Sequence, residues 1–461
     1  MGDSRMADLE GLTRSLLRNG LNEEEIIEKI AIEYLFYKNI SKEEAEKLAR
    51  AILQEVKNSN KSPDDQLIQE ILEYPKAEIT IGKQGVGCRG WGDFFVHKLI
   101  AELSKTKKIP ILSPQSLDDA GAIIYQGQKE KVFIVSKMEG MHSRLSDYPF
   151  LAGFHVTRAA LRDLYVKGAK PISIMIDIHL ADDADVGKLF DFMGGVAAVA
   201  ELSKTPITAG STLRIGGDMV IGTRITGGIA AIGLAKKLLM RRDIRPGDAI
   251  LMTEGAGGGT IVTTAIYGAM HEVIKETLNI KFIKACEGLF ESRLLPEIHC
   301  MCDVTNGGLR GDLHEVAYEA KVGMTVYEEK IIPLVNGEVF QMLKERKTDY
   351  LGVSLDALLI FCPAGVKDQV LTEVRRREIK IEVIGEVNAN KSEIKLISER
   401  GETKLFPRFR ESAYTPIKQE IGEEISEGEK HQWATQIETC AAQALQKREK
   451  FVRWISEKEG D

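Results

Sequence analysis

The spacing of hydrophobic and polar residues predicts helices in the first part of the chain. Apolar side chains recur at helical spacing through residues 8–58. Ser41 stands where a helix cap is expected, and Glu44 three positions later completes a capping box. The segment NSNKSPDD (58–65) is rich in turn residues and predicts a linker. We therefore expect a helical N-terminal extension over residues 1–75.

From about residue 77 the pattern changes to short apolar segments that alternate with helical ones, which predicts a first domain over residues 76–240. Strands are predicted at 78–82, 122–125, 132–135, 173–178 and 229–233. Helices are predicted over 92–104, 151–167 and 186–203. The short strands and their mixed order favour an α+β fold over a doubly wound parallel sheet.

A second unit of strands and helices is predicted over residues 241–402. GDAILMTE, ALLIFCP and IEVIGEV have the pattern of strands, and helices are expected over 261–277 and 366–377. The basic run RRDIR (241–245) is expected to form a solvated hinge between the two units. The remaining residues, 403–461, predict a helical tail, because 425–459 carries an apolar stripe among charges.

Composition argues against several classes of protein. The net charge of -7 argues against a general nucleic-acid binder, which needs a basic face. The chain has no run approaching the roughly 18 apolar residues of a membrane-spanning helix. Six cysteines are spread along the chain without a zinc-binding spacing, so we expect reduced thiols in a soluble, cytoplasmic protein.

The common nucleotide-binding and hydrolase motifs are absent. The glycine turn in EGAGGGTIV has no P-loop lysine, and Thr260 stands where a dinucleotide-binding motif needs its third glycine. G-x-S-x-G and the kinase catalytic-loop signature do not occur.

The remaining candidates for a functional site are acidic and glycine-rich turns that lie far apart in the chain. Asp118 and Asp119 precede an apolar strand, Asp163 lies in a helix, and Asp303 ends a strand before a Thr-Asn-Gly-Gly turn. Carboxylates of this kind suit Mg²⁺, which shares its coordination sphere with phosphate oxygens. Backbone N–H groups in glycine turns form concave anion sites.

These residues and their order resemble the AIR synthase (PurM-like) superfamily, and most closely its archaeal AIR synthase-related proteins. The resemblance covers about residues 80–400. It is carried by five blocks in the family's order: SLDDAGAI, ALRDLYVKGAKP, RPGDAILMTEGAGGGT, the segment that begins CDVTNGGLRGDLHEV, and the segment that begins ALLIFCPAGVKDQ.

The resemblance implies two α/β domains, a homodimer formed through the first of them, and a cleft that binds ATP, Mg²⁺ and a small-molecule substrate. Carried over by position, the resemblance gives three of the Mg²⁺ ligands as Asp118, Asp119 and Asp163. It places Asp303 near the substrate as a catalytic residue. It assigns the turn Asn306-Gly307-Gly308 to phosphate.

The segment GVGCRGWGDFFVH (85–97) resembles a glycine loop that folds over the triphosphate in several members of the family. Bare backbone at Gly85, Gly87 and Gly90 would let N–H groups approach oxygens closely. Arg89 would grip phosphate through two hydrogen bonds.

Two departures from the family pattern concern the metal site. The family's Gly-Gly-Asp-Thr motif is represented by AGST (209–212), in which a hydroxyl replaces the carboxylate and Thr212 remains a candidate cofactor contact. Lys137 replaces an aspartate in SKMEG, which makes it a candidate catalytic cation. Glu139 is then the candidate fourth metal ligand.

Three functions stay open on the sequence alone. The first is an ATP- and Mg²⁺-dependent enzyme that phosphorylates or activates a small-molecule or acyl/carbamoyl-type oxygen. The second is a non-catalytic nucleotide-binding partner in a maturation complex, docked through the helical ends. The third is an activator similar to selenophosphate synthetase that uses Cys88.

Overall fold

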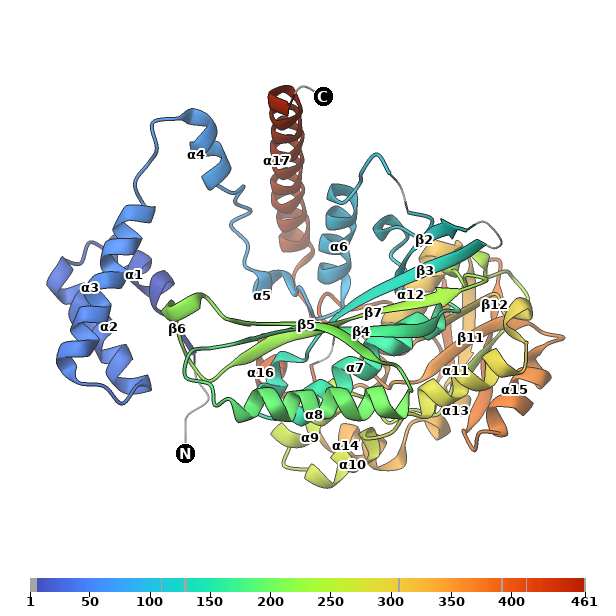
Figure 1. Cartoon of the computed structure of the whole chain (residues 1–461). Coiled ribbons are helices and arrows are strands. Elements are labelled where there is room, and N and C mark those ends of the chain that lie inside the picture. The colour runs from blue at the N-terminus through green and yellow to red at the C-terminus, as the bar shows by residue number, and fades with distance from the viewer. Residues whose placement is uncertain are drawn as a thin grey trace.

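The computed structural model describes residues 6–108, 110–127, 131–305, 307–390, 393–411 and 413–459. Two β-sheets with helices packed between and around them form the body of the molecule, and helical segments project from it (Figure 1). Each sheet belongs to one half of the body, and the candidate site lies between the halves.

The first sheet has the strand order β2-β3-β7-β4-β5. Its neighbours are antiparallel except β4 and β5, which run parallel. The strands are β2 (Gly121–Gln126), β3 (Lys131–Gly140), β4 (Lys170–Leu180), β5 (Ile207–Arg214) and β7 (Ile225–Ala235). Helices α7 (Pro149–Val166) and α8 (Gly187–Leu202) pack against each other, and α7 contacts β3, β4 and β7. The apolar alternation of the strands explains this packing, because one side chain in two faces α7.

The second sheet has the strand order β14-β13-β10-β12-β8-β11-β9. Its strands are β8 (Asp248–Thr253), β9 (Cys300–Asp303), β10 (Gly323–Tyr327), β11 (Leu358–Pro363), β12 (Ile381–Asn388), β13 (Ile394–Ser398) and β14 (Gly401–Lys404). Its helices are α9 (Gly259–Tyr267), α10 (Ile274–Thr277), α11 (Lys281–Glu291), α12 (Gly308–Ala320), α13 (Glu328–Ile331), α14 (Gly337–Glu345) and α15 (Lys367–Arg375). Helix α7 also contacts β9, α9 and α11, and one hydrophobic core spans both halves. This helix is therefore buried between the two halves.

The N-terminal helices form an arm beside the first sheet (Figure 1). The arm contains β1 (Met6–Asp8), α1 (Leu9–Arg18), α2 (Glu23–Tyr37) and α3 (Lys42–Ser59), with α4 (Gln66–Leu72) beyond it. The arm has its own apolar core, and β1 pairs with β6 (Val220–Gly222) of the body. Lys38 adds ion pairs of 2.5 Å to Asp182 and 2.6 Å to Asp183. The arm is therefore joined to the body by a strand pair and by partly buried ion pairs.

The C-terminal tail returns to the first half of the chain. Helix α17 (Glu427–Glu459) packs against α6 (Trp91–Leu103), and both project from the body in Figure 1. Arg448 donates from Nη1 to the carbonyl oxygen of Leu103 at 3.2 Å. The shorter helix α16 (Pro416–Ile421) precedes α17 and lies at the candidate site.

Most predicted elements are confirmed, and the exceptions have local causes. The predicted strand at 78–82 is wrong, because Thr80 caps the short helix α5 (Ile81–Gln84). The helix predicted over 261–277 is interrupted after Tyr267, where Ala269 adopts a left-handed φ of 57°. The predicted solvated hinge at 241–245 is also wrong in part, because Arg241 is only 2% exposed.

No helix in the described part of the chain is both long enough and apolar enough to cross a bilayer. All six cysteines have free thiols, and four of them are buried.

Candidate active site

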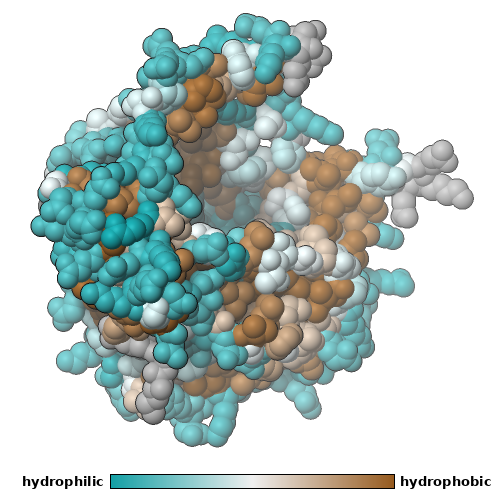
Figure 2. Space-filling view, turned by 60° about the vertical axis from the view of Figure 1, so that its left-hand side comes forward, coloured by the Kyte–Doolittle hydropathy of each residue, from teal (hydrophilic) through white to brown (hydrophobic). Residues whose placement is uncertain are grey.

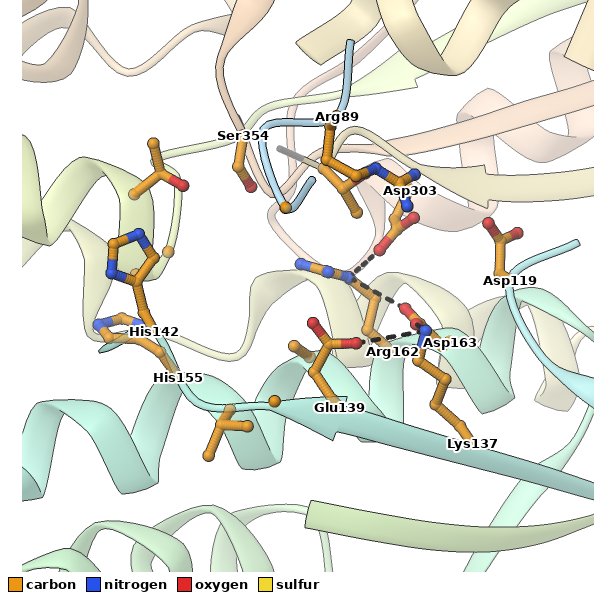
Figure 3. Close-up of a pocket in the computed structure, with 18 of the residues that line it drawn as sticks. Arg89, Asp119, Lys137, Glu139, His142, His155, Arg162, Asp163, Asp303 and Ser354 are labelled. Carbon is orange, nitrogen blue, oxygen red and sulfur yellow. Dashed lines mark ion pairs between the residues drawn. The ribbon is translucent and has the colours of Figure 1, made fainter. Parts of the chain in front are cut away.

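A cavity of about 750 Å³ opens between the two halves of the body (Figure 3). Its lining comes from β3, α7, the loop before α9, the end of β9 and helix α16. Asp118, Asp119, Asp163, Glu139 and Asp303 all line it. The structure thus brings the acidic residues singled out in the sequence to one cavity.

The two-residue alternation of a strand and the three- and four-residue spacing of a helix bring the site's side chains to the cavity. Along β3, Lys137 and Glu139 are two residues apart and share the face that looks into the cavity. On α7, His155, Arg158 and Arg162 follow one another at intervals of three and four, so they share one helical face. Figure 3 shows the side chains of this strand and this helix approaching one another.

Asp118 and Asp119 are held by two buried cations. Lys167, which is fully buried, contacts Asp118 and lies 2.9 Å from Asp119 Oδ2. Arg241 Nη2 lies 2.6 Å from Asp119 Oδ1. Burial alone would lower the pKa of the Lys167 amine, but Asp118 and Asp119 raise it above its ordinary value. Burial likewise opposes ionisation of Asp119, but Arg241 and Lys167 hold its pKa below the usual range. Lys167 and Asp119 are therefore charged and paired.

Asp163 is also paired with a partly buried cation, Lys137, which stands where the family pattern has an aspartate. Lys137 Nζ lies 2.6 Å from Asp163 Oδ2 and 3.2 Å from Glu139 Oε2 (Figure 3). Burial works against the charged amine, but Asp163 and Glu139 raise the pKa of Lys137 well above its ordinary value. Lys137 therefore joins two of the carboxylates that were expected to bind metal.

Arg162 joins the two halves of the cavity. Its Nε contacts Asp303, and its Nη1 lies 2.5 Å from Asp356 Oδ1. Arg158 Nη2 lies 2.7 Å from the other oxygen of Asp356. Burial raises the pKa of the Asp303 carboxyl, and the neighbouring Asp163 adds to that rise against the pull of Arg162. Asp303 is thus a buried carboxyl that holds a proton more tightly than an ordinary aspartate.

The far end of the cavity is formed by a histidine and the tail. His142 Nε2 lies 2.8 Å from the Tyr414 hydroxyl, and its Nδ1 lies 3.2 Å from Thr263 Oγ1. Burial and the nearby Lys418 and Arg144 lower the pKa of His142 to about 4. Tyr414 and Lys418 themselves line the cavity. The C-terminal tail therefore contributes a wall of the site.

The glycine segment is tied to the tail. The backbone N–H groups of Trp91 and Gly92 donate to the carbonyl oxygens of Arg408 and Phe409 at 2.8 and 3.1 Å. A Cβ on Gly90 would lie 2.5 Å from the Phe409 oxygen. Glycine is therefore required here by the close approach of the tail.

The candidate phosphate contacts are divided among several places. Gly87 and Arg89 line the cavity, and their N–H groups donate to Asp93 at 2.9 and 3.0 Å. Gly85 packs beside Arg410. The Arg89 side chain lies 3.4 Å from Glu315 Oε2.

The other predicted contacts that the structure describes lie outside the lining. Gly307 and Gly308 begin α12 with positive φ angles of 105° and 65°, and a Cβ on Gly308 would lie 2.2 Å from the Leu351 carbonyl oxygen. Thr212 lies on β5, whose residues are all exposed, and it is not brought to the cavity. Asn306 lies outside the described residues.

The residues present do not fit a magnesium ion in this arrangement. Mg²⁺ needs carboxylate oxygens that are free to coordinate it. Here Lys167, Arg241, Lys137 and Arg162 already pair with the four aspartates of the cavity. Across the described ranges, no three acidic, histidine or cysteine side chains form a group able to hold a metal ion. The predicted ligand set Asp118, Asp119, Asp163 and Glu139 therefore shares a cavity without forming a metal site.

Sequence reasoning found Lys137 and Arg89 but missed the other cations of the site. Lys167 and Arg162 stand in the block that contains Asp163, and Arg241 stands in the run expected to be solvated. Arg158 and His155 gave no motif of their own. The one available signal was the helical interval of three and four that places these α7 residues beside Asp163.

Family models match both halves of the body. The model described as AIR synthase related protein, N-terminal domain, matches residues 117–235, and the C-terminal domain model matches residues 245–397. The chain is 44% identical to uncharacterized protein MJ1416 of Methanocaldococcus jannaschii, over 98% of this chain and 99% of the relative. It is 29% identical to putative hydrogenase expression/formation protein MJ0676 of the same organism, over 54% of this chain and 72% of the relative.

More distant similarities extend to named enzymes and solved structures. Selenide, water dikinase of Myxococcus xanthus is 30% identical over 41% of this chain and 53% of its own length. The HypE–HypF complex structure aligns with a TM-score of 0.53 at 18% identity, over 68% of this chain and 99% of that chain. HypE in complex with ATP aligns with a TM-score of 0.51 at 18% identity, over 67% and 92% of the two chains. The chain therefore belongs to the AIR synthase related family and has its two-domain fold of mixed helices and sheets.

Proposed function

We propose that this protein uses ATP to phosphorylate or otherwise activate an oxygen atom of a small molecule, such as an acyl- or carbamoyl-type group. The observation that supports the proposal is the convergence of Asp118, Asp119, Asp163 and Asp303 on one cavity. These are the acidic positions carried over from the family resemblance. The structures of HypE with ATP and of a ThiL with AMPPCP and TMP support a nucleotide as the co-substrate.

In the proposed reaction the acceptor oxygen attacks the terminal phosphorus of ATP. The bond from that phosphorus to its bridging oxygen breaks and ADP leaves. A hydroxyl or carbamoyl acceptor also passes a proton to a base, whereas a carboxylate acceptor has none to lose. Asp303 is the proposed base, because burial and Asp163 raise the pKa of its carboxyl and a higher pKa makes a stronger base. Lys137 and Arg162 are proposed to hold the phosphate oxygens. No step is assigned to a metal ion.

The experiment is ATP turnover by the full chain with a panel of carboxylic, carbamoyl and hydroxyl acceptors, measured as ADP release. Loss of a general base typically costs about 10²–10⁴-fold in rate. Asp303→Asn is therefore expected to lose at least ~100-fold of acceptor-dependent turnover. Glu254→Gln is the control, because Glu254 pairs with Lys281 away from the cavity. Full turnover in Asp303→Asn would contradict the assignment.

We also propose that the first sheet pairs with a second copy through its outer face. Met138, Ala230, Met175 and Ala209 lie side by side across four strands of that face. Met138 is 58% exposed in the single chain. Figure 2 shows apolar surface along a hollow framed by hydrophilic residues. A contiguous exposed apolar face of this kind is typical of an interaction site.

A non-catalytic role in a maturation complex is the second candidate. Val452, Trp454 and Ile455 expose apolar surface near the end of α17. The HypE–HypF structure supports the idea of a protein partner for members of this fold. This candidate predicts nucleotide binding without turnover on any acceptor, together with loss of a partner when residues 420–461 are removed.

The third candidate, an activator that uses Cys88, has less support. Gly87 and Arg89 line the cavity, whereas Cys88 between them does not belong to the described lining. Full activity of Cys88→Ser would exclude it.

A further inference from the structure

The charges of the cavity are balanced within the chain. Among the residues that the structure describes, its lining contains six carboxylates and seven lysine or arginine side chains, and Lys167 lies directly behind two of the carboxylates. The four aspartates each have a cationic partner from the chain. Asp163 Oδ1, which accepts no hydrogen bond from the described residues, also faces a cation, because it lies 3.6 Å from Arg162 Nε.

A divalent ion could enter only by displacing these partners. Lys167 has no exposed surface, and Arg241 is 2% exposed, so neither can move its charge into water without a rearrangement of the core. Placing Mg²⁺ on Asp118 and Asp119 would bring two further positive charges beside these cations. Removing the partner of a buried charge is strongly destabilising.

The cations that face the cavity are suited to an anion. Lys137 is 21% exposed at the side chain and Arg89 is 30% exposed, so both have surface available to a bound molecule. Arg162 lies between them in Figure 3. Lysine binds phosphate as a point charge, and arginine binds it through two parallel N–H groups.

We infer that this cavity binds the triphosphate of ATP directly through its lysine and arginine side chains, without a divalent cation. The inference rests on the proposed function, because it specifies how the same cavity binds its nucleotide. Lys137, Arg162 and Arg89 share their positive charge between the phosphates and their present partners Asp163, Asp303 and Glu315. Lys167 and Arg241 keep Asp118 and Asp119 neutralised.

The test is isothermal titration of the full chain with ATP, once with excess EDTA and once with MgCl₂. The expected result is a dissociation constant in EDTA less than tenfold weaker than that in MgCl₂. A constant weaker by tenfold or more in EDTA would overturn this inference and leave the proposed function standing. Absence of binding under both conditions would overturn both.

A matched pair of variants on β3 sharpens the test. Lys137→Asp restores a carboxylate to the cavity, and we expect its ATP affinity to fall at least tenfold in EDTA and to recover with MgCl₂. Lys131→Asp makes the same charge change at the exposed start of the strand and is expected to bind as the wild type. If Lys137→Asp fails to fold, as judged by circular dichroism, Lys137→Gln replaces it, with the same loss expected in EDTA. A Lys137 variant that binds ATP as tightly as the wild type in EDTA would overturn the inference.

Discussion

The two faces of the five-stranded sheet differ in the charge and in the exposure of their side chains. On the inner face Val135 is buried against α7, and Lys137 is paired with Asp163 and Glu139. On the outer face the intervening Met138 is 58% exposed. Neighbouring residues of one strand, Lys137 and Met138, therefore have different environments. The inner face balances its charge within one copy of the chain, whereas the outer face leaves exposed apolar area, which the proposed pairing with a second copy would cover.

The largest effect is expected from breaking the inner charge balance at Lys167. Lys167→Met leaves Asp118 and Asp119 buried with one cation fewer, and removal of one partner from a buried ion pair costs about 3–5 kcal/mol. The fall in the free energy of unfolding is measured by urea denaturation. Lys170→Met, at an exposed position three residues later, is the control. Unchanged stability of Lys167→Met would mean that the pair is not a stabilising contact.

A smaller effect is expected from adding a charge to the outer face. Met138→Glu would bury an unpaired carboxylate in the proposed dimer, at a cost of about 2 kcal/mol or ~30-fold in the dissociation constant. Light scattering over a concentration series measures the oligomeric state. Leu278→Glu adds the same charge at an exposed apolar residue of the other half and should not change it. A wild type that remains monomeric at every concentration would contradict the proposed pairing.

The smallest effect is expected from His142, at the end of the inner face. Burial keeps its imidazole neutral in the folded protein down to about pH 4, whereas the unfolded chain takes up the proton near its ordinary pKa of about 6.5. The unfolded state therefore binds more protons as the pH falls through 6.5, and stability is lost between about pH 6.5 and 4.

Between pH 7 and pH 5, the free energy of unfolding should fall by about 1–2 kcal/mol less in His142→Gln than in the wild type. His155 acts in the same direction, because burial also lowers its pKa, so part of the slope remains in the variant. Thermal or urea unfolding at the two pH values measures the difference. Identical pH slopes for variant and wild type would show that His142 is already solvated.

Much of the fold was predictable because it depends on short-range patterns. The strand at 173–178 and the helix over 151–167 follow from local alternation and helical spacing, and both are present as β4 and α7. The predicted strand at 78–82 failed because an isolated apolar stretch does not distinguish a strand from a capped helical turn.

The acidic half of the candidate site was predictable, whereas of the basic half only Lys137 and Arg89 were. Asp118, Asp119, Asp163 and Asp303 stand in recognisable blocks, and all four line the cavity. Arg241 lies more than 120 positions from Asp119, so only the fold brings the two together. A charged run has the same appearance in sequence whether it is solvated or buried beside a distant partner, which is why RRDIR was expected at the surface.

The contact between His142 and Tyr414 also affects how the protein is made. A nascent chain that has left the ribosome as far as residue 404 contains both sheets, the aspartates and their cations. It still lacks Tyr414 and Lys418, which line the cavity, and Arg408 and Phe409, which accept hydrogen bonds from the glycine segment. Synthesis therefore adds this wall of the cavity only after both sheets have been made, so a chain cut short at residue 404 would lack it.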